Sequence, residues 1–296
     1  MRNSTEHDIK FIELNGQPVV RTYSAEVRNL TYTGGKTEHS CIAMFFTVQY
    51  LRINPTGNLE FNLKIDRRLF LDKKDRPVFK PSKAQKLALA VASINDDLIF
   101  EVTKNYKLIG VKNINEIRSK WKTIRSSLLL SFPDLEDLCN NFDIQLAEGN
   151  IQSLFKNDNF YNFFFANIFY HKFDEDSFSV AKKVISNGLE NISVPIIESR
   201  QITKQDRYFQ NITIATEGQL DVENKTFPLY ELNQFLSELP VKLGSKHDLD
   251  FIYQSSYQIS PRIGLITEGK LDYVFEIKNF YRKNTTINFK LEKDER

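Results

Sequence analysis

Hydrophobic and polar side chains alternate along two stretches of the first third, which predicts β-strands there. From Thr22 to Arg28 the odd positions are apolar and the even positions polar, and residues 59–66 repeat this pattern after an Asn-Pro-Thr-Gly turn at 54–57. Between them, residues 41–53 are apolar on both faces, as in a covered central strand. We therefore expect an antiparallel meander in this part of the chain.

The middle of the chain shows the three-to-four-residue spacing of amphipathic helices. We expect helices over 82–94, from Asn113 to a stop at Pro133, over 134–148 and over 150–171. Asn113 is the expected N-cap of the second of these, with Glu116 three residues later in a capping-box arrangement. Residues 172–190 then read as a charged junction.

Strand patterns return in the last third, at 192–204, at 207–222 and from Asp248 to the end, with one short helix at 228–239. The order of these elements predicts an α+β protein with largely antiparallel, curved sheet and amphipathic helices packed on one face. We expect an N-terminal α+β half over 1–175, with a meander followed by helices. A C-terminal β-rich half with one short helix is expected over 176–296.

Charge and composition narrow the classes of function. The 40 basic and 38 acidic side chains leave a net charge of +2, which disfavours a nucleic-acid partner. The two cysteines, Cys41 and Cys139, lack the spacing of a zinc site and are expected to be buried apolar residues. No cofactor or metal site is predicted. Without a hydrophobic leader or a stretch long enough to span a bilayer, the sequence predicts a cytoplasmic protein.

One catalytic motif can be tested by its spacing. Glu276 and Lys278 form the E-x-K pair of a metal-dependent nuclease, in which an aspartate from a neighbouring strand completes a Mg²⁺ site. Here both residues fall on the polar face of an alternating strand, opposite Tyr273 and Phe275. We therefore interpret the motif as an exposed salt pair on an ordinary strand and keep the nuclease only as an alternative.

Aromatic residues are concentrated in the segment NFYNFFFANIFYHKF, residues 159–173. They surround most of the expected helix, leaving a thin polar face of asparagines. A helix of this kind either forms the centre of a core, or lines an apolar cavity or meets a partner, because so much exposed aromatic surface would be a liability. The sequence leaves both interpretations open.

A regular pattern of strands and turns is seen in the closing segment, residues 257–293, YQISPRIGLITEGKLDYVFEIKNFYRKNTTINFKLEK. One strand breaks at a glycine-containing turn, a second repeats the period, and a third closes the sheet. This resembles the curved half-barrel sheets of bacterial lipoprotein-carrier-like proteins and related uncharacterised bacterial families. The resemblance covers mainly residues 192–296 and, more weakly, 8–111.

The resemblance implies a hydrophobic ligand held between a curved sheet and the helices on its concave face. In that arrangement Phe251 and four other aromatic side chains of the closing strands would face the cavity, and the aromatic helix would be its lid. Those families are exported, whereas no leader or lipobox cysteine is seen near the start of this sequence.

We accordingly predict a non-catalytic binding or assembly protein of unspecified oligomeric state. It would present its sheet and aromatic helix to a protein partner or enclose a hydrophobic ligand. The residues predicted to form this surface are Phe160, Phe164, Phe165, Phe169, Tyr253, Tyr257, Tyr273 and Phe275.

Overall fold

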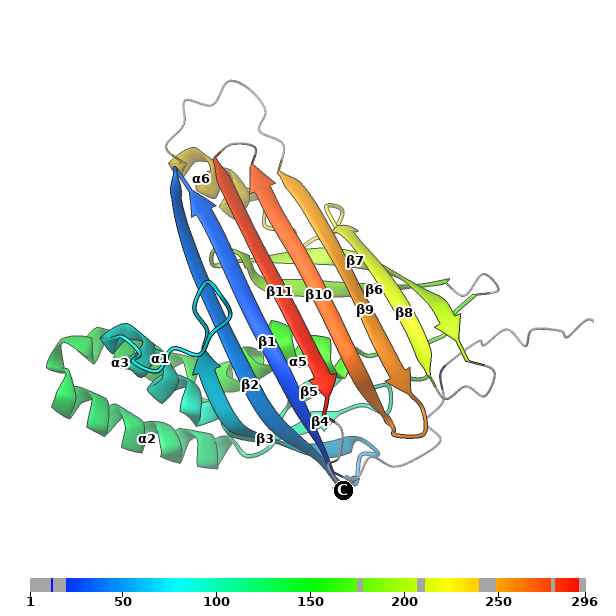
Figure 1. The fold of residues 1–296 in the computed structure, drawn as a ribbon, viewed down its shortest axis with the longest axis horizontal. Helices are drawn as coiled ribbons and strands as arrows, with labels where there is room; N and C mark the ends of the chain where they lie inside the picture. Colours follow the sequence, from blue (N-terminus) through cyan, green and yellow to red (C-terminus); the bar gives the residue numbers. More distant parts are fainter. Residues whose placement is uncertain are drawn as a thin grey trace, which may run out of the picture.

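The strands form one antiparallel sheet that does not close on itself (Figure 1). The computed structural model describes residue 12 and residues 20–174, 178–206, 211–239, 249–277 and 280–292. Within these residues eleven strands lie in the order β5-β4-β3-β2-β1-β11-β10-β9-β8-β7-β6. Their bounds are β1 Val20–Thr33, β2 Lys36–Ile53, β3 Leu59–Phe70, β4 Asp97–Val102, β5 Leu108–Val111, β6 Phe178–Leu189, β7 Ile192–Gln205, β8 Ile212–Leu220, β9 Asp250–Ser260, β10 Leu265–Ile277 and β11 Tyr281–Leu291.

Six α-helices accompany the sheet in the described part of the chain. They are α1 Lys83–Ala92, α2 Ile114–Ser131, α3 Glu136–Gln145, α4 Asn150–Lys156, α5 Asn159–Phe165 and α6 Leu229–Glu238. The sheet bends around α5, with β3–β5 on one side and β6–β7 on the other (Figure 1). The predicted α+β class with a curved antiparallel sheet is confirmed in outline.

The first and last strands of the chain lie side by side. β1 pairs with β11 in an antiparallel register that runs from Tyr23 opposite Leu291 to Thr33 opposite Tyr281. This pairing joins strands from both ends of the sequence into the one sheet. The predicted division of the chain between residues 175 and 176 falls outside the described residues, so the two-half organisation stays a prediction.

Side-chain alternation explains which face of the sheet is buried. Tyr23 and Ala25 on β1, Phe46 on β2 and Phe289 on β11 all point to the concave face and are at most 6% exposed. Their neighbours on the other face are mainly polar. Because successive side chains on a strand point to opposite faces, this period of two directs one apolar surface towards α5.

Helix α5 lies inside the curve and fills it with aromatic rings. The ring of Phe164 contacts those of Tyr23, Phe46 and Phe289 at centroid distances of 5.2, 5.5 and 5.1 Å. The helix is shorter than predicted, because the expected helix over 150–171 is divided into α4 and α5. It ends at Ala166, which adopts the left-handed conformation with φ 51°.

Two local predictions need correction. Residues 172–190, predicted to be a junction, contain strand β6 at one edge of the sheet. Asn113 does stand at the N-cap position of α2, but its side chain makes no capping bond. Its Oδ1 instead accepts from the Ile99 amide, and its Nδ2 donates to the Asp97 carbonyl, so it fastens the helix start to β4.

Candidate ligand-binding site

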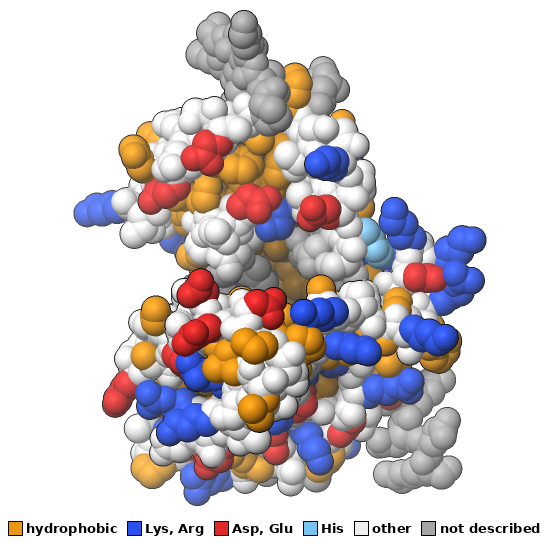
Figure 2. Space-filling model, turned by 90° about the vertical axis from the view of Figure 1, so that its left-hand side faces the viewer, with side chains coloured by type: hydrophobic (Ala, Val, Ile, Leu, Met, Phe, Trp, Pro, Cys, Tyr) orange, Lys and Arg blue, Asp and Glu red, His pale blue; other side chains and the backbone are white. Residues whose placement is uncertain are grey.

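A cavity of about 570 Å³ lies on the concave side of the sheet, next to α3, α4 and the start of α5. We call it the concave cavity. In the space-filling view the molecule is hollowed between its helical lower part and the upper part of the sheet (Figure 2). The apolar lining comes from three strands and three helices: Val27, Tyr273, Ile287, Ile144, Leu154 and Phe160.

The remainder of the lining consists mainly of amide and hydroxyl side chains, with two charged groups. Asp158 caps α5 by accepting from the Tyr161 amide at 3.0 Å, and burial raises the pKa of its carboxyl. Lys283 donates to the Asn187 carbonyl at 2.8 Å, and burial lowers the pKa of its ammonium. Both charges already have partners, so the cavity suits a neutral, partly apolar molecule with hydrogen-bonding groups.

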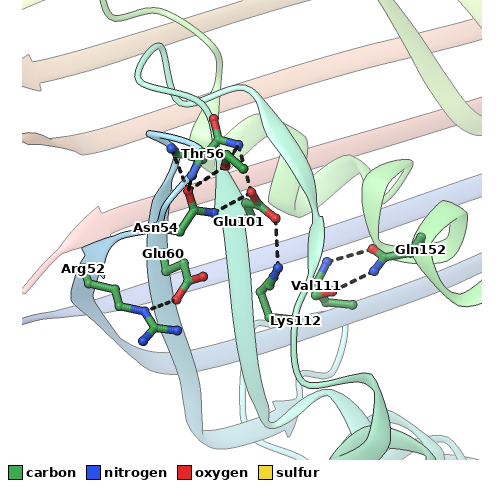
Figure 3. A network of polar contacts seen from close by, with 9 residues as sticks. Arg52, Asn54, Thr56, Glu60, Glu101, Val111, Lys112 and Gln152 are labelled. Atoms are coloured by element: carbon green, nitrogen blue, oxygen red, sulfur yellow. Dashed lines mark hydrogen bonds and ion pairs between the residues drawn. The ribbon is translucent and has the colours of Figure 1, made fainter.

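Two side-chain amides each bond to one residue of an edge strand of the open sheet. Gln152 on α4 accepts from the Val111 amide at 3.0 Å and donates to the Val111 carbonyl at 2.8 Å, which caps β5 (Figure 3). Asn159 on α5 makes the same paired contact with Ser186 on β6, at 3.0 and 2.8 Å. Each amide satisfies backbone groups that an edge strand leaves open. Helices α4 and α5 thereby bridge the gap in the sheet.

The turn before β3 is held to β4 by a second polar network. Glu101 accepts from Asn54 and Asn58 at 2.7 and 2.8 Å, and Lys112 approaches its other oxygen at 3.4 Å (Figure 3). The bond from Asn58 is the main cause of a lowered pKa for the Glu101 carboxyl. This network stiffens the β5 side of the gap.

A buried ionic cluster lies at the C-terminal end of α5, whereas the concave cavity adjoins the start of this helix. Glu198 and Arg200, two residues apart on β7, are each 0% exposed. Glu198 binds Arg200 Nη2 at 2.8 Å and Lys183 Nζ at 2.7 Å, and it accepts a hydrogen bond from the Tyr253 hydroxyl. Arg200 also donates to the carbonyls of Ala166 and Asn167, at 3.1 and 2.9 Å. The cluster therefore fixes the C-terminal end of α5 to the sheet.

The ionisation of Glu198 makes the cluster sensitive to acid. Burial alone would raise the pKa of this carboxyl, but Lys183 and Arg200 outweigh burial and bring the pKa to about 2 from an ordinary value of 4.5. A carboxyl with a depressed folded-state pKa stabilises the fold above its unfolded pKa. That contribution is lost as the pH falls from there towards the folded-state value.

We expect Glu198→Gln to be less stable than the wild type by about 3 kcal/mol at neutral pH, because glutamine cannot neutralise Arg200 and Lys183. This stability gap between variant and wild type should shrink by roughly 1 kcal/mol by about pH 3.5. At that pH the unfolded wild type takes up a proton on Glu198, which the glutamine of the variant cannot do. Urea unfolding of both proteins across this pH range measures the gap. A gap that stays constant as the solution is acidified would contradict this assignment.

All eight predicted surface residues are buried, with exposed fractions from 0% to 9%. Phe160 and Tyr273 line the concave cavity. Phe164, Phe165 and Phe169 pack around α5 in the core, and Tyr253 joins the ionic cluster. Tyr257 and Phe275 also belong to this core. Contact of these residues with a ligand or partner stays a prediction.

The ionic cluster was missed at the level of sequence, although a signal was present. Glu198 and Arg200 occupy the inward positions of the predicted strand 192–204, between the apolar Ile196 and Ile202. Charged side chains on the apolar phase of a strand indicate a buried pair, because an unpaired buried charge is costly. Lys183 carries no such signal, because the sequence predicts a junction over 172–190 and not a strand.

The nuclease alternative gains no support. Glu276 lies on the face of β10 opposite Phe275, faces Asp250 of β9 in the register, and has Arg282 as its ion-pair partner at 3.8 Å. Lys278 lies outside the described residues. No group of three or more histidine, cysteine, aspartate or glutamate side chains in the described residues could hold a metal ion. Cys41 and Cys139 are buried free thiols, as predicted.

Comparisons with known proteins assign no family. No family model and no curated protein matches the sequence. One similar solved structure, described as lipid-protein interactions in lipovitellin, is 8% identical, with a TM-score of 0.47. The match covers 94% of this chain and 25% of that one, so this chain spans about a quarter of that protein. Another, a DUF1329 family protein from Desulfovibrio piger, is 11% identical, with a TM-score of 0.16 and coverages of 93% and 86%. Both scores are below 0.5, so neither likeness carries an argument about function.

Among the described helices, none has both the length and the apolar character needed to cross a membrane.

Proposed function

We propose that this protein is a non-catalytic binding protein that takes an apolar or amphipathic small molecule into the concave cavity. The observation that supports this most directly is the cavity itself. Its volume of about 570 Å³ falls in the range typical of small-molecule sites. Its lining combines six apolar side chains with neutral hydrogen-bonding groups and two charged side chains, Asp158 and Lys283, whose polar atoms already have partners. Such a lining would desolvate an apolar body while orienting a polar end.

The position of the cavity supports the proposal as well. Its walls are fixed strands on one side, and on the other α3 and α4, with Leu154 and Ile144 exposed at 37% and 62%. Apolar side chains that are exposed beside a cavity gain contacts when a ligand enters. A bacterial source and a cytoplasmic address remain predictions from the sequence.

Leu154→Asp tests this function, because it places a charge at the apolar wall. We expect the affinity for an apolar fluorescent dye such as Nile red to fall by about tenfold, the equivalent of losing roughly 1.4 kcal/mol of apolar contact. Dye titration by fluorescence measures it. The matched control is Leu138→Asp on α3, since Leu138 is also 37% exposed and does not line the cavity. Equal loss in both variants, or none in either, would refute binding at this cavity.

A protein partner is the second candidate, and one observation favours it. Phe178, Val180 and Val184 share the outward face of edge strand β6 and are 41%, 63% and 52% exposed. Exposed apolar residues on an edge strand favour the addition of a strand from another chain. If a partner polypeptide binds there, it should co-purify with the wild type but not with Val180→Lys, and this variant should bind the dye as the wild type does. Retention of the polypeptide in this variant would exclude β6 as the docking edge.

A further inference from the structure

A second pocket, of about 280 Å³, lies where the two edges of the open sheet approach each other. We call it the seam pocket. One wall comes from Lys107 and Leu108 at β5, and the opposite wall from residues 181–184 of β6. Lys156 on α4 and residues after α5 complete it, and Arg200 of β7 also contributes to the lining. The pocket is thus built from segments that only the fold brings together.

The lining of the seam pocket is strongly cationic. It includes five basic side chains and no carboxylate: Lys107, Lys156, Lys182, Lys183 and Arg200. Two carboxylates lie close behind, Glu198 with Lys183 and Arg200, and Asp221 with Lys182 at 3.2 Å. Five positive and two negative charges leave +3 in this region, against +2 for the whole chain. An anion would relieve this concentration of charge.

The inner cations still have hydrogen-bond donors to offer. Arg200 has five N–H groups and makes four hydrogen bonds, two to Glu198 and one each to Ala166 and Asn167, so one N–H of Nη1 has no partner in the described residues. The side chain of Lys183 is 20% exposed and has three N–H groups, while Glu198 is its one ion-pair partner among the described residues. A buried guanidinium with a donor to spare is an effective anion ligand.

The outer cations differ in their environment. Lys107 and Lys156 are exposed at the two sides of the pocket, and neither forms an ion pair within the part of the chain that the structure describes. Exposed, unpaired lysines contribute attraction and adjustable donors without a structural role. They can therefore be replaced without disturbing the buried cluster.

We propose that the seam pocket is a binding site for a phosphate-sized anion, with Arg200 and Lys183 as the inner ligands and Lys107 and Lys156 as the outer ones. The proposal goes beyond the apolar ligand of the concave cavity and does not depend on it. The pocket volume accommodates a phosphate group and a small substituent. Such a group can come from a free phosphate or from the headgroup of an anionic lipid.

Isothermal titration calorimetry of the whole protein with inorganic phosphate tests this site, with ionic strength held constant by chloride. We expect saturable binding of one phosphate by the wild type. The double variant Lys107→Gln, Lys156→Gln should weaken it by about tenfold or more. The matched control, Lys270→Gln with Lys290→Gln, removes the same charge from exposed positions on the opposite face of the sheet and should leave the affinity unchanged.

Sedimentation with phosphatidylcholine vesicles, with or without phosphatidylglycerol, distinguishes the two sources. If the anion is a headgroup, the wild type and the control variant will bind the anionic vesicles and the seam variant will not. If it is a free phosphate, calorimetry will show binding and the vesicles will not. Absence of binding in both assays would overturn the proposal, as would equal weakening by the two double variants.

Discussion

Replacing Arg200 by alanine is expected to destabilise the folded protein by about 3–5 kcal/mol, the usual cost of removing one partner from a buried ion pair. Glu198 would keep Lys183 and Tyr253 but lose its fully buried partner. The carbonyls of Ala166 and Asn167 would lose their donors at the same time. A buried acceptor without a donor adds its own desolvation cost.

Urea unfolding, followed by far-ultraviolet circular dichroism, measures the change for Arg200→Ala. The control is Glu276→Ala, which also breaks an ion pair, but one whose side chains are 36% and 50% exposed. An exposed pair of this kind contributes less than about 1 kcal/mol. If the two variants lost similar free energy, the buried cluster would not be what holds the end of α5.

The second large effect is expected for Phe164→Ala, at about 3–5 kcal/mol, because it opens a cavity in the centre of the core. Phe164 is 2% exposed and packs against rings from β1, β2 and β11 as well as its helical neighbours Phe160 and Phe165. None of these rings can move far, since each also belongs to a strand or to α5.

The matched control for Phe164 is Phe79, which is 88% exposed. Phe79→Ala should stay within about 0.5 kcal/mol of the wild type. Thermal or urea unfolding compares the two variants directly. A small loss for Phe164→Ala would mean that α5 is not a fixed part of the core, and would restore the lid interpretation of the aromatic helix.

The sequence predicts the faces of the sheet well, because its strands bury one face and expose the other. On β10, Tyr273 and Phe275 point inward and Glu276 outward, as the period of two requires. The same rule fails for β6, where inward Lys183 is polar while outward Val180 is apolar and 63% exposed. At an edge strand beside an ionic cluster, hydrophobic alternation is no longer a guide.

The two pockets and the ionic cluster could not be predicted from the sequence in the same way. Ala166 and Asn167 end α5 at φ values of 51° and 50°, although no glycine or proline marks the break. The bonds from Arg200 to their carbonyls supply the reason, and these depend on tertiary structure. The pairing of β1 with β11 likewise joins residues that are 248 to 268 positions apart. Both pockets depend on such distant neighbours, so local patterns could not reveal them.

Native mass spectrometry of the gently purified full chain tests the central claim, that the concave cavity holds a small molecule. We expect an added mass on the order of a few hundred daltons on the wild type, matching the cavity volume. The occupancy should be reduced in Leu154→Asp and kept in Leu138→Asp. A bare wild-type protein that also fails to take up an apolar dye, or equal occupancy in all three proteins, would contradict the claim.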